Sequence, residues 1–170
     1  MDPLLSVVNR KINEQGEFLY PRFKDTGSRE VRTPTKLENG DTYEGEWSHK
    51  GFPHGHGTLY KADGGVLWCS FYKGIPEGLG RLIEANGSVY NGDFVKGKKH
   101  GYGKLVHGKV TYEGEFRENK KTGKAIEEIA GTSRFNGYFV LGKKEGPGKL
   151  ENHWKRSSYE GNFHNNMMSG

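Results

Sequence analysis

The sequence predicts an all-β protein: an elongated, twisted single antiparallel sheet of consecutive β-hairpin repeats, with a short N-terminal helix or irregular segment. The main observation is an aromatic–x–Gly–x–aromatic pattern whose copies begin every 22 to 24 residues, near positions 43, 67, 90, 112, 135 and 159. A fixed period of this length is typical of repeat architectures. The glycines agree with it, because 24 of the 27 follow residue 40.

The chain therefore divides into an N-terminal cap or irregular segment, 1–40, and a repeat array, 41–170. The copy at Leu67 is degenerate, because Leu67 and Cys69 replace the aromatic residue and the glycine. In the copy that begins at Tyr112, Ala125 replaces the final glycine, so we expect its return strand to be distorted. The last copy is cut off at Gly170.

The first forty residues lack the repeat. Leu4, Val8 and Ile12 stand at i+4 spacing, which predicts a helix over 3–14. We expect this helix to cover the end of the sheet. Residues 21–36 are expected to form a loop, and residues 36–38 a lone strand that caps the first repeat.

Each copy predicts two strands. Tyr90, Gly92 and Phe94 fall on one face of a strand because side chains alternate, and the glycine gives neighbouring rings room to lie flat across the backbone. Asn-Gly and Asp-Gly pairs at 39–40, 63–64 and 86–87 are strong hairpin signals. One hairpin buries too little apolar surface alone, so neighbouring copies must share a core.

Composition indicates a thin core. Hydrophobic residues make up 32% of the chain and the mean hydropathy is −0.88, but the 12% aromatic residues stand in strict register, which argues against disorder. Cys69 is the single cysteine, so no internal disulfide forms and a reducing compartment is expected. We expect an intracellular, cytoplasmic protein, in association with cytoskeleton or membrane.

The pattern Y-x-G-x-[WF]-x-x-G-x-x-[HE]-G-x-G resembles the MORN (membrane occupation and recognition nexus) repeat. Copies at Tyr43, Tyr90, Tyr112, Phe135 and Tyr159 match it well, and the copy at Leu67 matches weakly. The resemblance implies a non-enzymatic scaffold or adaptor that docks partner segments along its sheet at cytoskeletal or membrane-associated structures. It also implies two alternatives, binding of acidic phospholipids and a role as the regulatory repeat region of a larger enzyme.

For a protein partner, we expect the anchors to be exposed parts of the aromatic stripe, since aromatic residues dominate interface energetics. These anchors are Trp47, Phe94, Phe116 and Phe139. The alternation leaves open which face of the sheet binds. The unpaired edge at the C-terminal end of the array is a candidate for self-association.

Three lysine pairs occupy the same two positions in consecutive copies: Lys98-Lys99, Lys120-Lys121 and Lys143-Lys144. Stacked copies would align them as a ladder at intervals of roughly 10 Å, suited to anionic head groups or to an acidic protein surface. The alternative is that lysines beside a hairpin turn only keep the edge soluble.

The remaining motifs predict no catalytic, cofactor-binding or metal-binding residue. His49, His54 and His56 lack the cysteine or carboxylate ligands that would complete a zinc site. The G-x-G pairs are not followed by the third glycine and helix of a nucleotide loop, and the net charge of +5 is small for nucleic-acid binding. No acid–base pair or activated nucleophile stands out, so we expect no enzyme and no nucleic-acid partner.

Overall fold

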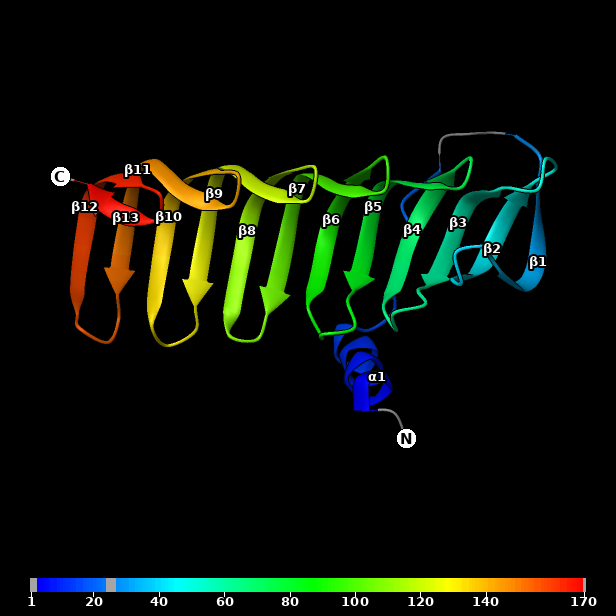
Figure 1. Cartoon of the computed structure of the whole chain (residues 1–170), viewed down its shortest axis with the longest axis horizontal. Coiled ribbons are helices and arrows are strands. Elements are labelled where there is room, and N and C mark those ends of the chain that lie inside the picture. Colours follow the sequence, from blue (N-terminus) through cyan, green and yellow to red (C-terminus); the bar gives the residue numbers. More distant parts are fainter. Residues whose placement is uncertain (1–2, 24–26, 170) are drawn as a thin grey trace. The chain divides into compact units, whose positions relative to one another are not determined.

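A computed structural model describes residues 3–23 and 27–169 of the chain, which forms two compact units, Met1–Gly97 and Lys98–Gly170. The elements of the first unit are α1 Pro3–Gln15, β1 Arg29–Lys36, β2 Thr42–Ser48, β3 Pro53–Tyr60, β4 Val66–Tyr72, β5 Ile75–Ile83 and β6 Val89–Val95. Those of the second are β7 Lys98–His107, β8 Val110–Arg117, β9 Lys120–Ile129, β10 Ser133–Val140, β11 Lys143–Asn152, β12 Ser157–His164 and β13 Met167–Ser169. Figure 1 labels these elements.

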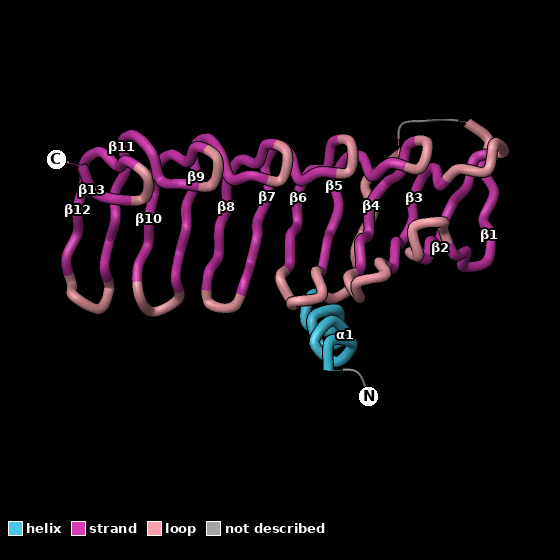
Figure 2. The backbone as a smooth tube through the Cα atoms, in the orientation of Figure 1, coloured by secondary structure: helices cyan, strands magenta, loops and turns pink. Residues whose placement is uncertain are grey.

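Within each unit every strand pairs with the next strand of the chain, and all these pairs are antiparallel. The described chain is thus built of consecutive hairpins in open antiparallel sheets, and it holds one short helix (Figure 2). The predicted fold class is confirmed.

Apart from the longer loop between β2 and β3, the hairpin tips are tight turns of two residues with positive φ, the signature of type I′ turns. Lys73-Gly74 and Leu141-Gly142 are typical pairs, with φ of 50° and 83°, and of 50° and 88°. Asn119 and Asn166 take the place of the glycine with φ of 70° and 72°, which asparagine tolerates better than most residues. The departure from glycine at Asn119 therefore leaves the turn intact.

A row of small residues crosses the strands of each unit. Gly57 lies opposite Cys69 and Gly80 opposite Gly92 in the first unit, and Gly114 lies opposite Ala125 in the second. This row lies on the same face of the strands as the ring that opens each copy, and we call that face the ring face. The opening rings are those of Tyr43, Tyr90, Tyr112, Phe135 and Tyr159. Cys69 and Ala125 stand in the row because both are small.

Tyrosine hydroxyl groups fasten these rings. The Tyr43 hydroxyl donates to the carbonyl of Glu46 at 3.0 Å, and the Tyr112 hydroxyl donates to that of Glu115 at 2.8 Å. Strand pairing shifts register between Gly45 and Trp47 and between Gly114 and Glu115. The hydroxyl therefore satisfies a backbone acceptor beside a β-bulge, where the ladder is interrupted.

The core consists of rings packed edge to face. In the second unit Tyr112 contacts Phe116 and Phe139 with centroids 5.0 and 5.1 Å apart, and Phe135 contacts Phe163 at 4.9 Å. In the first unit Tyr43 lies 4.9 Å from Phe71. Each such pair contributes about 0.5–1.5 kcal/mol beyond burial of its area, so these ring contacts stabilise the packing of neighbouring hairpins.

The N-terminal segment departs from two expectations. Residues 29–36, expected as a loop, form strand β1, which pairs with β2 and bulges between Arg32 and Thr35, around Pro34. The loop prediction was wrong for these residues: β1 is exposed along most of its length, so its sequence carries no alternation of apolar residues that would indicate a strand. Residues 24–26 of the same stretch lie outside the described residues. The lone strand expected at 36–38 is not found in these described residues, because the chain turns toward β2 there.

Helix α1 does not cover the terminal strand. Its Val8 packs in a buried cluster with Val66, Ile83 and Val89, where β4 and β6 begin and β5 ends, and Figure 1 shows α1 below β5 and β6. The helix therefore covers the ends of β4, β5 and β6 in the first unit.

The return strand of the copy at Tyr112 was expected to be distorted. Strand β9 runs without a break from Lys120 to Ile129, and its bulge falls at the same place as in the other copies, which shift register near Gly45, Cys69 and Gly137. That expectation was wrong, because Ala125 lies opposite Gly114, where the absence of a side chain leaves room for the alanine methyl group.

Candidate binding surfaces

The four predicted aromatic anchors are core residues. Trp47, Phe94, Phe116 and Phe139 are only 2–4% exposed, because neighbouring rings pack against their faces and edges. The expectation that parts of these rings reach the surface is wrong. The surfaces open to a partner lie elsewhere on the sheets.

The lysine pairs split between two directions, because consecutive residues of a strand point to opposite faces. The first members, Lys98, Lys120 and Lys143, are exposed at the hairpin tips. The second members, Lys99, Lys121 and Lys144, are half-buried. The expected ladder of six aligned lysines is therefore a row of three, all in the second unit.

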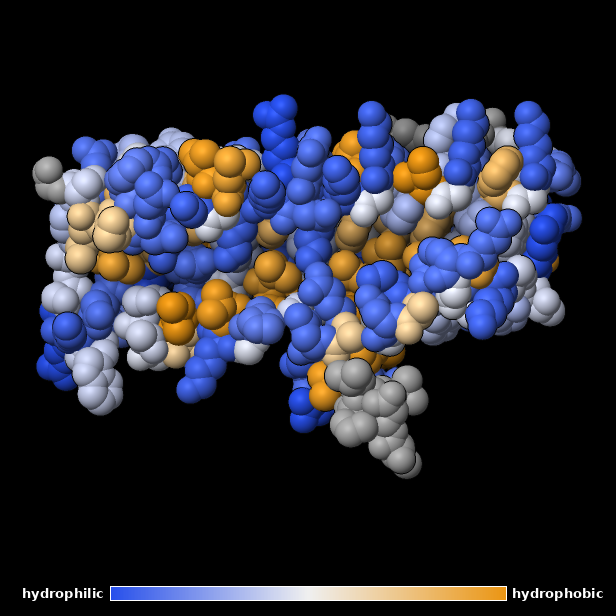
Figure 3. Space-filling model, in the orientation of Figure 1, coloured by the Kyte–Doolittle hydropathy of each residue, from blue (hydrophilic) through white to orange (hydrophobic). Residues whose placement is uncertain are grey.

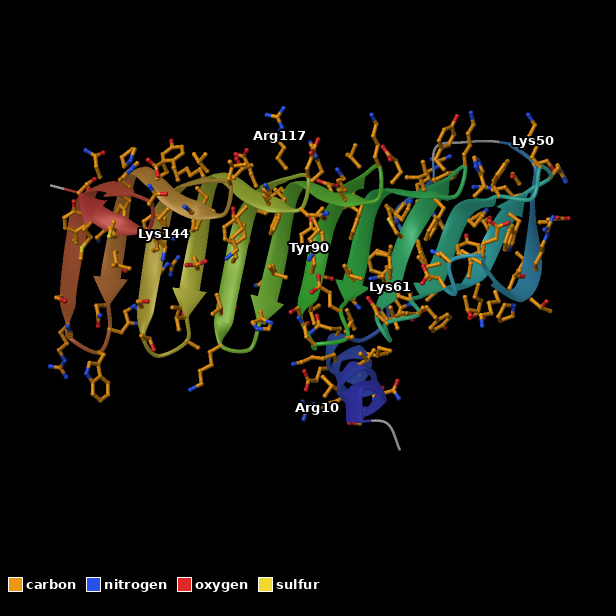
Figure 4. All side chains as sticks on the ribbon, in the orientation of Figure 1. Arg10, Lys50, Lys61, Tyr90, Arg117 and Lys144 are labelled. Atoms are coloured by element: carbon orange, nitrogen blue, oxygen red, sulfur yellow. The ribbon has the colours of Figure 1, made fainter. Side chains whose placement is uncertain are left out.

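Lys121 and Lys144 turn to the ring face and share one carboxylate. Their ammonium groups lie 2.6 and 2.9 Å from the oxygens of Glu127, and they lie over the rings of Tyr112 and Phe135 at 4.6 and 5.0 Å. In Figure 4 the side chain of Lys144 lies against the sheet. Burial would raise the pKa of Glu127, but hydrogen bonds and charge from both lysines outweigh it, so its pKa lies below its ordinary value.

Glu127 was missed by the sequence reasoning, although a signal exists. In the strand pairing Glu127 lies opposite Phe135, whereas Leu59 lies opposite Tyr43 and Leu150 opposite Tyr159. Leu82 and Leu105 occupy the same position in their copies. A charged residue in a leucine position of the repeat marks an ion cluster.

The hairpin tips combine exposed apolar and basic side chains. Phe52, Ile75, Val140 and Leu141 are exposed there. Exposed basic residues stand beside them at positions 50, 73, 96, 117, 120 and 143. In Figure 4 Lys50 of the first unit and Arg117 of the second each point outward from the hairpin tips of their own unit, and Figure 3 shows hydrophilic side chains projecting from the tips of each unit.

The face opposite the rings is partly covered in the first unit. Residues 16–23, which we call the strap, run across β3 to β5. The Tyr20 ring stacks on the His56 ring with centroids 4.8 Å apart and planes 16° apart, and the Tyr20 hydroxyl lies 3.2 Å from that of Thr58. Arg81 donates from Nη1 to the carbonyl of Gly16 at 2.8 Å, and its guanidinium lies 5.5 Å from the centre of the Phe18 ring.

Sequence reasoning missed the strap, since it expected residues 21–36 to form a loop and assigned nothing to 16–20. Three aromatic residues in eight, Phe18, Tyr20 and Phe23, were the available signal. They predict burial against something, but not against which surface.

The histidines and the cysteine have structural roles. His54 accepts a hydrogen bond from the backbone N–H of Lys73 at 3.3 Å, and His49 lies 2.8 Å from the hydroxyl of Ser28. Cys69 is fully buried, and burial raises the pKa of its thiol to about 12. In the residues that the structure describes, no three His, Cys, Asp or Glu side chains gather as metal ligands.

Within residues 3–23 and 27–169, no helix has the length and apolar character needed to cross a bilayer.

The fold and these surfaces define the class of this chain: a tandem β-hairpin repeat protein with a core of rings over glycines. More particularly, it belongs to the MORN repeat family. The model of this family, described as "MORN repeat", matches six segments, 43–66, 70–89, 90–108, 112–130, 135–151 and 159–170. The predicted family is thereby confirmed, and the match of the second copy begins at 70 rather than at the degenerate Leu67.

One solved structure that the chain resembles is the TCP domain of SAS-4 (dCPAP) of Drosophila melanogaster, in complex with a proline-rich motif of Ana2 (dSTIL). The two share 11% identity, the alignment covers 85% of this chain and 96% of that chain, and the TM-score is 0.33. Among curated proteins, none matches the chain.

Proposed function

We propose that this MORN-repeat chain is a non-enzymatic scaffold that binds a segment of a partner protein along its sheet. The observation that supports it is the strap, an extended segment that the first unit already holds across three strands. Ring stacking, a hydroxyl pair and an arginine–carbonyl bond hold it. A segment of another protein can use the same kinds of contact, which recur in peptide recognition by aromatic-lined surfaces.

The setting that we propose is a cytoskeletal or membrane-associated structure in the cytoplasm. The single cysteine, which is buried and carries a raised thiol pKa, suits a reducing compartment. A scaffold of this kind requires only a stable sheet with an accessible surface.

The test is a selection of displayed peptides on the purified full chain, followed by measurement of their dissociation constants and of hydrogen exchange. We expect peptides that bind in the micromolar range, about −8 kcal/mol, and that slow exchange of strand amides. Failure to enrich any peptide over an unrelated bait protein would overturn the proposal.

The hairpin tips favour a second candidate function, peripheral binding to a membrane rich in acidic phospholipids such as phosphoinositides. Exposed apolar side chains stand there beside basic ones, a combination that suits the boundary between head groups and acyl chains. Of the ladder, only Lys98, Lys120 and Lys143 are exposed for this role.

Liposome flotation with phosphoinositides tests this candidate through two triple variants of equal charge. Replacing Lys98, Lys120 and Lys143 by Gln should weaken binding about 100-fold, at about 1 kcal/mol for each basic residue near an anionic surface. The control replaces Lys104, Lys124 and Lys149 by Gln; these three are exposed on the strands, away from the tips, and should matter little. Equal flotation of both variants would reject the tip surface as a lipid site.

A further inference from the structure

The strap uses repeat positions that also occur in the second unit. Tyr20 stacks on His56, which directly precedes Gly57 of the glycine row, and reaches Thr58, which directly follows it. Arg81, which holds Gly16, directly follows Gly80. The strap therefore rests on the two residues that flank a row glycine on the return strands.

The corresponding residues of the second unit belong to β7, β9 and β11. Those that precede the row residue are Tyr102, Lys124 and Pro147, and those that follow it are Lys104, Ile126 and Lys149. Tyr102 takes the place of His56 and is 58% exposed. A ring of the kind that the strap stacks on is thus open in the second unit.

Two shallow hollows lie at these positions. One, of about 450 Å³, is lined by Tyr102, Glu113, Lys124, Ile126 and Asn136 among others. The other, of about 460 Å³, is lined by Lys124, Asn136, Tyr138, Pro147 and Lys149 among others. Lys124 and Asn136 line both hollows, so the two adjoin.

The hollows offer the same kinds of contact as the strap site. Tyr102 and Tyr138 present exposed rings, and the Tyr102 ring is held by its hydroxyl, which donates to Glu113 at 3.2 Å. Lys124 lines both hollows and carries an ammonium group, which can donate to a carbonyl of a bound segment as Arg81 donates to that of Gly16. Ile126 supplies apolar surface to the first hollow and Pro147 to the second.

We propose that these adjoining hollows form a binding site for an extended partner segment that carries two aromatic side chains four or five residues apart, a spacing like that of Phe18 and Phe23 in the strap. This inference rests on the proposed scaffold function and names the place and the chemistry of the partner. One aromatic ring stacks on Tyr102, a second packs beside Tyr138, and Lys124 donates to a carbonyl between them. Tyr102 on β7 and Tyr138 on β10 are three strand spacings apart, roughly 14 Å, which four to five extended residues span.

The probe is a peptide with the sequence of residues 16–23 in which a photoreactive benzoylphenylalanine replaces Tyr20, mixed with the intact full chain. We expect mass spectrometry to place the cross-links on β7 to β10. Tyr102→Ala should weaken binding of the unmodified peptide roughly 2- to 12-fold, the loss expected for one aromatic pair, and Tyr102→Phe should retain it.

Trp154→Ala is the control, because Trp154 is a highly exposed aromatic residue in the turn between β11 and β12 and should leave binding unchanged. Cross-links on His56 or Thr58, which would mean exchange with the chain's own strap, or no binding at millimolar peptide, would overturn the inference. In either case, display-selected peptides that bind and protect other strands would leave the scaffold function standing.

Discussion

The ring of Tyr43 leaves no space for a side chain at Gly57. A Cβ atom built on Gly57 would lie 2.2 Å from the Tyr43 hydroxyl oxygen and 2.3 Å from Cζ. Gly137 has the same relationship to Phe135, at 2.5 Å from Cζ. Glycine is thus required at positions 57 and 137 by ring packing and not by turn conformation.

Gly57→Ala should therefore lower the free energy of unfolding by about 3 kcal/mol, the upper end of the cost of overpacking. The matched control is Gly51→Ala in the same hairpin, where φ is +81° but no atom lies within 4 Å; it should cost about 1 kcal/mol. Urea unfolding followed by circular dichroism measures both. Equal losses in the two variants would show that backbone conformation, and not the ring, sets the requirement.

The Glu127 cluster predicts that charge removal and apolar replacement differ. Glu127→Gln leaves Lys121 and Lys144 half-buried without their carboxylate and should cost about 1–2 kcal/mol, less than a fully buried pair. Replacing the whole cluster, with Glu127→Leu, Lys121→Met and Lys144→Met together, should be close to neutral, because leucine occupies the position of Glu127 in other copies and well-packed apolar residues often replace a complete ion cluster without loss. Urea unfolding of the two variants checks this order, and a greater loss for the triple variant would contradict it.

The same cluster predicts a pH dependence. The pKa of Glu127 lies below its ordinary value of 4.5, so its ionised form stabilises the folded chain above that pH, and this contribution is lost as the pH falls through the lowered pKa. Relative to Glu127→Leu, the wild-type protein should lose thermal stability between about pH 4.5 and pH 3. Parallel melting temperatures over that range would be inconsistent with the cluster, since all other carboxylates are common to both proteins.

The turn at Asn119 predicts different results for two small replacements. Asn119 has a φ of 70°, and its side-chain oxygen accepts the backbone N–H of Lys99 at 2.8 Å. Asn119→Gly keeps the conformation and loses the hydrogen bond, a cost of about 1 kcal/mol. Asn119→Ala also pays for positive φ, roughly 1 kcal/mol more. Thermal unfolding of both variants distinguishes the two costs, and identical melting temperatures would mean that the alanine variant relaxes the turn.

Much of this protein follows from its sequence. The period of 22 to 24 residues and the Tyr–x–Gly–x–Phe alternation determine the hairpins, the shared face of rings and glycines, and the family, because side-chain direction in a strand depends only on parity. These features could be predicted from the local sequence pattern because each depends only on local backbone geometry. Ala125 was the exception, because a distorted return strand was expected there and β9 is continuous.

Only the tertiary structure decided which side chains remain accessible. Trp47, Phe94, Phe116 and Phe139 are buried because rings from neighbouring hairpins cover them, and no pattern within one copy gives that coverage. The two lysines of each pair point in different directions because the strands continue through both residues. Lys121 and Lys144, which belong to two different hairpins, meet at Glu127. The strap lies across three strands far from it in sequence, so its place depends on long-range packing that local periodicity does not encode.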